Sequence, residues 1–72
     1  MDLNTFLAHA VRLELDAEQA YLQLIGLMQE RGNRDATEFF REMASYSRRH
    51  RETAMRRAGF SDLADIPELI AA

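Results

Sequence analysis

The feature that most constrains this chain is a long apolar stripe, repeating at helical spacing, in its first third. Every third or fourth residue is apolar or aromatic with one exception, in the series Leu3, Leu7, Ala10, Glu14, Ala17, Tyr21, Leu24 and Met28. A repeat of this kind predicts an amphipathic α-helix that buries one side. The exception is Glu14, and a buried carboxylate costs several kcal/mol unless another group pairs with it or a metal ion binds it. The fold must therefore supply a partner for Glu14.

The rest of the chain predicts an all-α fold with one short turn. A first helix is expected over about residues 3–31 and a second over about 35–58, because Gly32-Asn33 interrupts two segments that are otherwise free of helix breakers. A short helical tail is expected over 61–71. The prediction is an antiparallel helical hairpin that forms a single domain over residues 1–72.

Capping residues set the expected ends of the helices. Asp2 or Asn4 is suited to begin the first helix, and Asp35 with Glu38 three residues later resembles a capping box that begins the second. Gly59 is a typical residue to end it.

Composition excludes several classes of protein. The chain has 72 residues, no cysteine, and a net charge of -3 with only arginine among its basic residues. Cysteine zinc sites, thiol nucleophiles and disulfides are excluded, so carboxylate and imidazole are the metal ligands that remain. An acidic balance argues against nucleic-acid binding, and no apolar run is long enough to span a membrane. A soluble, cytoplasmic protein is expected.

The second helix has a polar interruption of its own. Its expected inward stripe consists of Ala36, Phe40, Met43, Ser47, His50 and Ala54. In an antiparallel hairpin with a turn near Asn33, residues at one level have numbers that add to roughly 65. Glu14 is then level with about position 51, and Glu18 with about Ser47. The two stripes therefore become polar at the same level, where His50 faces Glu14.

Two interpretations of this layer are open from the residues alone. A carboxylate facing an imidazole has the ligand chemistry of an iron, manganese or zinc site. Alternatively, Glu14 and His50 simply hydrogen-bond each other as a satisfied core pair. Ser47 needs no ligand role, because a helical serine can bond to its own backbone.

The residue pattern resembles the ferritin-like superfamily, in particular its rubrerythrin-like branch. Glu14 is followed seven residues later by Tyr21, and Phe39-Phe40 precedes a frame in which Glu-x-x-His is expected and Ser47-Arg-Arg-His50 stands. The resemblance covers roughly residues 3–58. It implies a carboxylate-bridged di-iron site in which Glu14 and His50 occupy ligand positions, although Ser47 replaces the bridging carboxylate.

The resemblance also implies a second copy of the chain. A complete ferritin-like bundle has two hairpins, and similar small proteins such as encapsulated ferritin-like proteins pair two chains. The apolar face of the first helix is also wider than one partner helix covers, with Leu13, Ala20 and Leu27 on one flank and Val11 and Ile25 on the other. We therefore expect a homodimer or higher homo-oligomer, with Glu18 as a hypothetical substitute for the missing carboxylate.

Three functions remain open at this stage. The first is iron binding by Glu14, His50 and Glu18 in a dimeric four-helix bundle, with a di-iron oxidoreductase activity such as ferroxidase or peroxide reduction as its enzymatic form. The second is a non-catalytic dimerisation or assembly module with a degenerate site. The third, disfavoured by interleaved acidic residues, is an acidic partner held on a basic strip formed by 48–51 and Arg56-Arg57.

Overall fold

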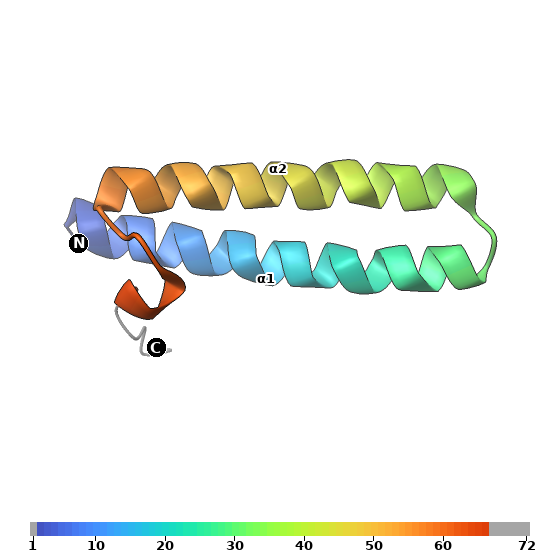
Figure 1. The fold of residues 1–72 in the computed structure, drawn as a ribbon, viewed down its shortest axis with the longest axis horizontal. Helices are drawn as coiled ribbons and strands as arrows, with labels where there is room; N and C mark the ends of the chain where they lie inside the picture. The colour runs from blue at the N-terminus through green and yellow to red at the C-terminus, as the bar shows by residue number, and fades with distance from the viewer. Residues whose placement is uncertain (1, 67–72) are drawn as a thin grey trace.

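The computed structural model describes residues 2–66, which form two long antiparallel helices and a short return segment. Helix α1 spans Leu3–Glu30 and helix α2 spans Arg34–Ala58, and a 3₁₀ turn, η1, follows at Leu63–Asp65. Figure 1 shows α1 and α2 side by side along their whole length, joined by one tight turn. The described part of the chain contains no β-strand. Of the tail expected over 61–71, the portion from 67 onward lies outside the described residues.

Side-chain caps begin both helices. Asp2 caps α1, where its carboxylate accepts a hydrogen bond of 2.7 Å from the backbone N–H of Thr5. In α2 the cap is Asn33, whose side-chain oxygen accepts from the N–H of Ala36 at 3.0 Å. The prediction that Asp35 caps α2 is wrong, because the helix already begins at Arg34 and places Asp35 in its first turn. There its negative charge interacts favourably with the dipole of α2 instead.

Both helices end on a glycine in the left-handed conformation. Gly32 has φ +67° and Gly59 has φ +77°. Beyond each glycine the next N–H reaches back to the last turn, from Asn33 to the carbonyl of Met28 and from Phe60 to that of Met55, both at 2.9 Å. This paired pattern satisfies carbonyls that a helix end leaves unbonded, and it turns the chain sharply.

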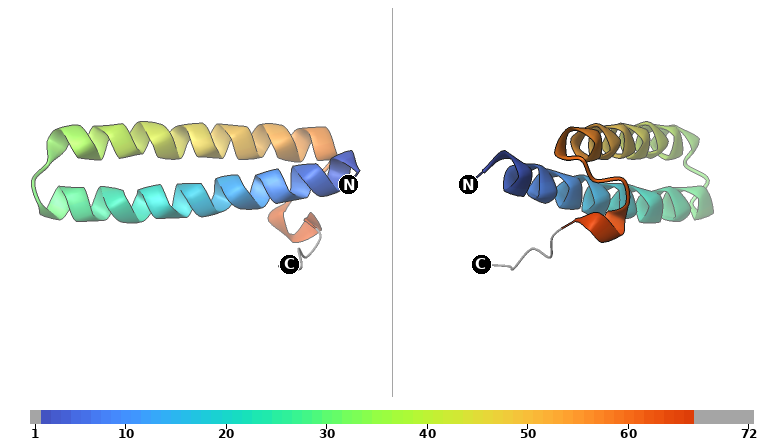
Figure 2. Two further views of the ribbon diagram at one scale, coloured as in Figure 1. Left: turned by 180° about the vertical axis from the view of Figure 1, so that it is seen from behind. Right: turned by 60° about the vertical axis from the view of Figure 1, so that its left-hand side comes forward.

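The core between the helices is thin and built largely from small residues. Those that are buried are Leu7, Ala8 and Val11 on α1 and Thr37, Ala44, Ser47 and Ala54 on α2. Ile66 packs against the Leu7, Val11 and Ala54 cluster, and the two views in Figure 2 place the return segment beside the N-terminal half of α1. Val11, expected on a flank, is thus central to the packed side of α1.

A second apolar side of the hairpin is left uncovered by residues 2–66. Its large exposed side chains are Leu3, Phe6, Leu13 and Leu27 on α1 and Phe39 and Tyr46 on α2. At 100° per residue, most of these positions lie a third of a turn or more around their helix from the side that packs on the other helix. In an antiparallel pair both displacements are toward the same side of the hairpin. We call these six residues the open face. Neither helix in the described range is long and apolar enough to cross a bilayer.

Candidate metal centre

Glu14 and His50 meet across the hairpin at the edge of the open face. The carboxylate Oε2 of Glu14 lies 3.6 Å from Nδ1 of His50, on the facing helix. The two side chains differ in exposure, at 30% for Glu14 and 66% for His50. A separation of 3.6 Å is longer than a good hydrogen bond, so the two groups are neighbours that do not bond tightly to each other. Both groups therefore keep donor atoms that a further ligand could use.

A second pair, of a different kind, lies beside the first in the same layer. One turn along α1 from Glu14, Oε1 of Glu18 accepts a hydrogen bond of 2.7 Å from Nη1 of Arg51. Both side chains are largely buried, with exposures of 15% and 16%. Charge-assisted bonds of this length are among the stronger polar contacts in proteins. Glu18 is thus occupied by a cation that belongs to the same chain.

Ser47 lies one helical turn before Arg51 and is buried, with 6% of its surface exposed. It occupies the position at which a second carboxylate was expected from the frame of the second helix. A hydroxyl brings no negative charge to the layer. Glu14 and Glu18 are consequently the carboxylates that this layer contains.

The donor set of a single chain fits only part of a metal site. Among the described residues, no group of three or more carboxylate or imidazole side chains lies close enough together to hold a metal ion. Glu14 and His50 supply one oxygen and one nitrogen donor, a combination that suits iron, manganese or zinc. Two protein donors leave a metal ion incomplete, so this fit needs donors from outside the chain. The metal role predicted for Glu14, His50 and Glu18 stays a prediction.

Arg51 is the residue of this layer that sequence reasoning misassigned. It was placed in a basic strip on the outer surface, whereas the structure turns its guanidinium inward to Glu18. The rule that level residues have numbers adding to roughly 65 could have identified it, because that rule places position 51 opposite Glu14. An arginine at a predicted core level next to two glutamates indicates an internal ion pair.

The aromatic side chains near the layer lie in two separate places. Tyr21 stacks on Phe40 with ring centroids 6.1 Å apart, between the helices. Tyr46 belongs to the open face, where the guanidinium carbon of Arg49 lies 4.7 Å from its ring centroid. In this cation–π contact the guanidinium of Arg49 covers part of the Tyr46 ring.

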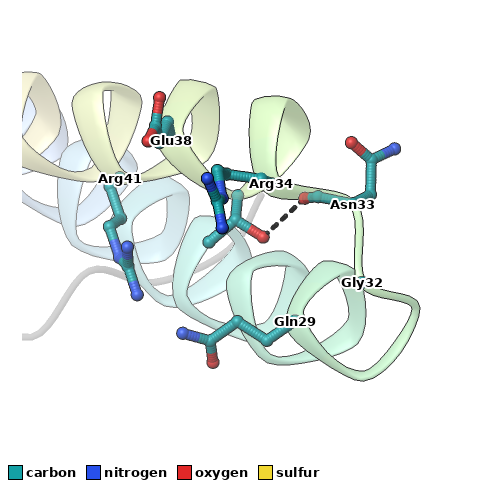
Figure 3. Close-up of a pocket in the computed structure, with 7 residues that line it drawn as sticks. Gln29, Gly32, Asn33, Arg34, Glu38 and Arg41 are labelled. Carbon is teal, nitrogen blue, oxygen red and sulfur yellow. Dashed lines mark hydrogen bonds between the residues drawn. The ribbon is translucent and has the colours of Figure 1, made fainter.

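A hollow of about 290 Å³ lies at the helix turn, away from this layer. It is lined by residues of the turn and of the flanking helix ends, namely Gln29, Gly32, Asn33, Arg34, Thr37, Glu38 and Arg41. Figure 3 shows its side chains around the hydrogen bond of 2.8 Å from the Thr37 hydroxyl to the Asn33 carbonyl. Gln29 is separated from Glu14 by about 22 Å along α1. The hollow and the Glu14–His50 pair are therefore independent features.

Comparison with known proteins identifies the family. The family model described as Rubrerythrin matches residues 5–66, which include both helices and the return segment. Neither the curated proteins nor the solved structures provide a match. Rubrerythrin domains have a ferritin-like helical fold and usually bind iron, and the all-helical hairpin agrees with that fold. The chain belongs to the Rubrerythrin family of the ferritin-like superfamily.

Proposed function

We propose that this protein binds iron through Glu14 and His50 when two copies of the chain pair their open faces into a four-helix bundle. The observation that carries the proposal is the 3.6 Å approach of Glu14 Oε2 to His50 Nδ1 on facing helices. A carboxylate and an imidazole converge there without bonding tightly to each other. Manganese or zinc would suit the same donors.

The open face supports pairing with a second copy. Its six large side chains are between 40% and 69% exposed. Together they expose on the order of several hundred Å² of apolar surface, the size range of patches that mark interaction sites and of the same order as the roughly 800 Å² per partner of a standard interface. On α1 the pattern continues through Ala10, Ala17, Ala20 and Leu24, which gives the alternating spacing of three and four that packs helices in bundles.

A twofold arrangement also brings the two incomplete sites together. Glu14 lies about 4 Å along the axis from the middle of α1. If the twofold axis crosses the open face at the level of Glu14, the two Glu14–His50 pairs lie level with each other and face a common position on the axis. A metal ion between the two pairs would then have protein donors from both chains, whereas a single chain offers donors on one side of the ion only.

In such a dimer the chain's own residues hold the ion and keep it from bulk water. Glu14 provides a hard oxygen ligand, His50 fixes the geometry through one ring nitrogen, and the apolar side chains of the open face limit access. Iron, when bound, would supply the change between Fe(II) and Fe(III). Iron oxidation, or a protective reaction with peroxide, is the activity that this donor set favours in the cytoplasm.

Metal analysis of the purified dimer tests the proposal. The wild-type protein is loaded with Fe(II) without oxygen, desalted and measured by mass spectrometry of the metal, in parallel with Glu14→Gln and His50→Ala. Both variants are expected to lose most of the bound iron. Glu30→Gln, which removes an exposed carboxylate at the far end of α1, is the control and keeps it. Iron content that is unchanged in both site variants would contradict the proposal.

A second candidate is an assembly module that uses the same dimer but no metal. The closed Glu18–Arg51 pair and the buried Ser47 favour it, because they remove carboxylate charge from the layer. It predicts that the melting temperature is the same with a chelator and with Fe(II). Iron bound only by the folded dimer would raise that temperature by mass action.

A further inference from the structure

The pair formed by Glu18 and Arg51 bears on how many metal ions the protein can hold. This inference rests on the proposed function, since it concerns the same layer of the same dimer. Its starting point is that Nη1 of Arg51 bonds to Oε1 of Glu18 at 2.7 Å, with both side chains about 15% exposed. A cation is therefore built into the position that an ion beside Glu18 would need.

We propose that Arg51 acts as an internal substitute for a second metal ion, so that the dimer binds one divalent ion per two chains and Glu18 is not a ligand. Arg51 is in this view a positioning residue. It restricts the site to Glu14 and His50 by keeping the Glu18 carboxylate engaged.

Charge balance in the layer supports a single ion. Two copies bring four carboxylates, from Glu14 and Glu18, and two guanidinium groups that stay protonated in proteins. Histidines that bind a metal do so as neutral imidazoles and add no charge. The layer of the dimer then carries two uncompensated negative charges, which one divalent cation balances. A second divalent ion would leave the layer with excess positive charge in a poorly solvated place, which is unfavourable.

The count of donors leads to the same number. Once Glu18 is engaged, the dimer offers two carboxylates and two imidazoles that are not bonded tightly elsewhere. Four oxygen and nitrogen donors complete one four-coordinate ion. Two ions would each be left with two protein donors, and the buried hydroxyl of Ser47 offers no charged ligand to bridge them.

Removal of the internal cation should therefore change the stoichiometry. In Arg51→Met, a side chain of comparable length without charge leaves Glu18 free to bind metal. The layer of the dimer then carries four negative charges, and a second ion is expected. In the double variant Glu18→Gln with Arg51→Met, both charges are absent and the expected number returns to one ion per dimer. Arg51→Lys keeps the cation and serves as the conservative control.

The experiment is a calorimetric titration of each metal-free dimer with Zn²⁺, which has no redox chemistry to complicate it. Wild type, Arg51→Lys and the double variant are expected to bind about one ion per two chains, and Arg51→Met about twice as many. Native mass spectrometry of the loaded dimer gives an independent count. If Arg51→Met is too unstable to titrate, Arg51→Gln takes its place, since it also removes the cation and keeps a polar side chain beside Glu18, and it too is expected to bind about two ions per dimer.

The outcomes separate this inference from the proposed function. One ion per chain in the wild type, or an unchanged number in a folded Arg51→Met dimer, would overturn the role of Arg51 while leaving metal binding intact. Absence of any Zn²⁺ or iron that depends on Glu14 and His50 would instead overturn the proposed function. A wild-type value of one ion per dimer that doubles in Arg51→Met supports both.

Discussion

Two polar pairs lie side by side in one layer of this hairpin, with Glu14 and Glu18 one turn apart on α1 and His50 and Arg51 adjacent on α2. They differ in distance and in exposure. Glu18 and Arg51 are 2.7 Å apart and about 15% exposed, whereas Glu14 and His50 are 3.6 Å apart with the imidazole 66% exposed. The first pair satisfies itself within one chain. The second lies at the edge of an apolar face that none of the described residues covers. Burial by the chain's own helices thus distinguishes a structural ion pair from a pair that remains available to a ligand.

The comparison predicts that only the second pair depends on another copy of the chain. Leu13→Glu, which places a further negative charge in the open face beside Glu14, should give the largest effect. It is 69% exposed in the single chain and would be buried twice in a twofold dimer. We expect dimerisation weaker by at least about 100-fold, because a charge without a partner is costly to bury.

Sedimentation of the variant over a range of concentrations measures that loss. Gln19→Glu is the matched control, since it adds the same charge at an exposed polar position of the same helix. It should leave the dimer intact. Equal dimerisation of both variants would show that the open face is covered by something other than a second copy.

Breaking the closed pair should give the next largest effect. Arg51→Met leaves the Glu18 carboxylate largely buried and without its cation, and such a change typically costs between about 1 and 3 kcal/mol for a pair that is not fully desolvated. Chemical denaturation of the metal-free protein measures it. The double variant with Glu18→Gln should recover most of the lost stability. A single variant as stable as the wild type would mean that solvent screens Glu18 despite its low exposure.

The same measurement on the open pair should show almost no change. In metal-free protein, Glu14→Gln and His50→Ala are each expected to alter the free energy of unfolding by less than about 0.5 kcal/mol, because the contact is long and half solvated. A loss comparable with that of Arg51→Met would indicate that Glu14 and His50 form a structural pair, as the alternative interpretation of the sequence holds. The distinction between the two pairs would then no longer hold.

Sequence reasoning found the helices and the level of the site but not the rotation of the helices. Periodicity and two glycines were enough to predict an antiparallel hairpin, and the level rule placed Glu14 opposite position 51, next to its observed neighbour His50. The expected stripes, however, lie between the packed side and the open face. Helix α1 is apolar on both sides, so the centre of its apolar surface points at neither, and Val11 is the residue that is fully buried.

That rotation decides which pair is closed. The predicted stripes placed Glu14 and His50 at the seam and left Glu18 on a flank with Arg51 on a solvated surface. In the structure both helices are turned so that Glu18 and Arg51 point between the helices. A pattern of apolar residues in one chain cannot reveal this, since it records the surfaces buried by all partners at once. In the proposed dimer, the second copy of the chain would select apolar residues on α1 just as α2 does.

A third carboxylate, Asp2, gives the smallest expected effect. It shows what an exposed carboxylate contributes to stability, for comparison with Glu14 and Glu18. Its side chain is exposed, and the N–H of Thr5 that it caps holds the pKa of Asp2 below its usual value of 3.8. A lowered pKa in the folded state means that the cap stabilises α1 at pH values above 3.8, and that this stabilisation is lost as the pH falls through the lower pKa of the folded protein.

Asp2→Asn keeps a capping side chain that does not titrate. Thermal melts of the two proteins should therefore agree near neutral pH to within a small difference from the helix dipole, and the wild type should lose stability relative to Asp2→Asn only below about pH 4. If the difference in melting temperature between the two proteins stays the same through the acid range, the charge of Asp2 does not contribute to the stability of α1. Asp2 would then differ from Glu18, whose charge is expected to stabilise the fold through its contact with Arg51.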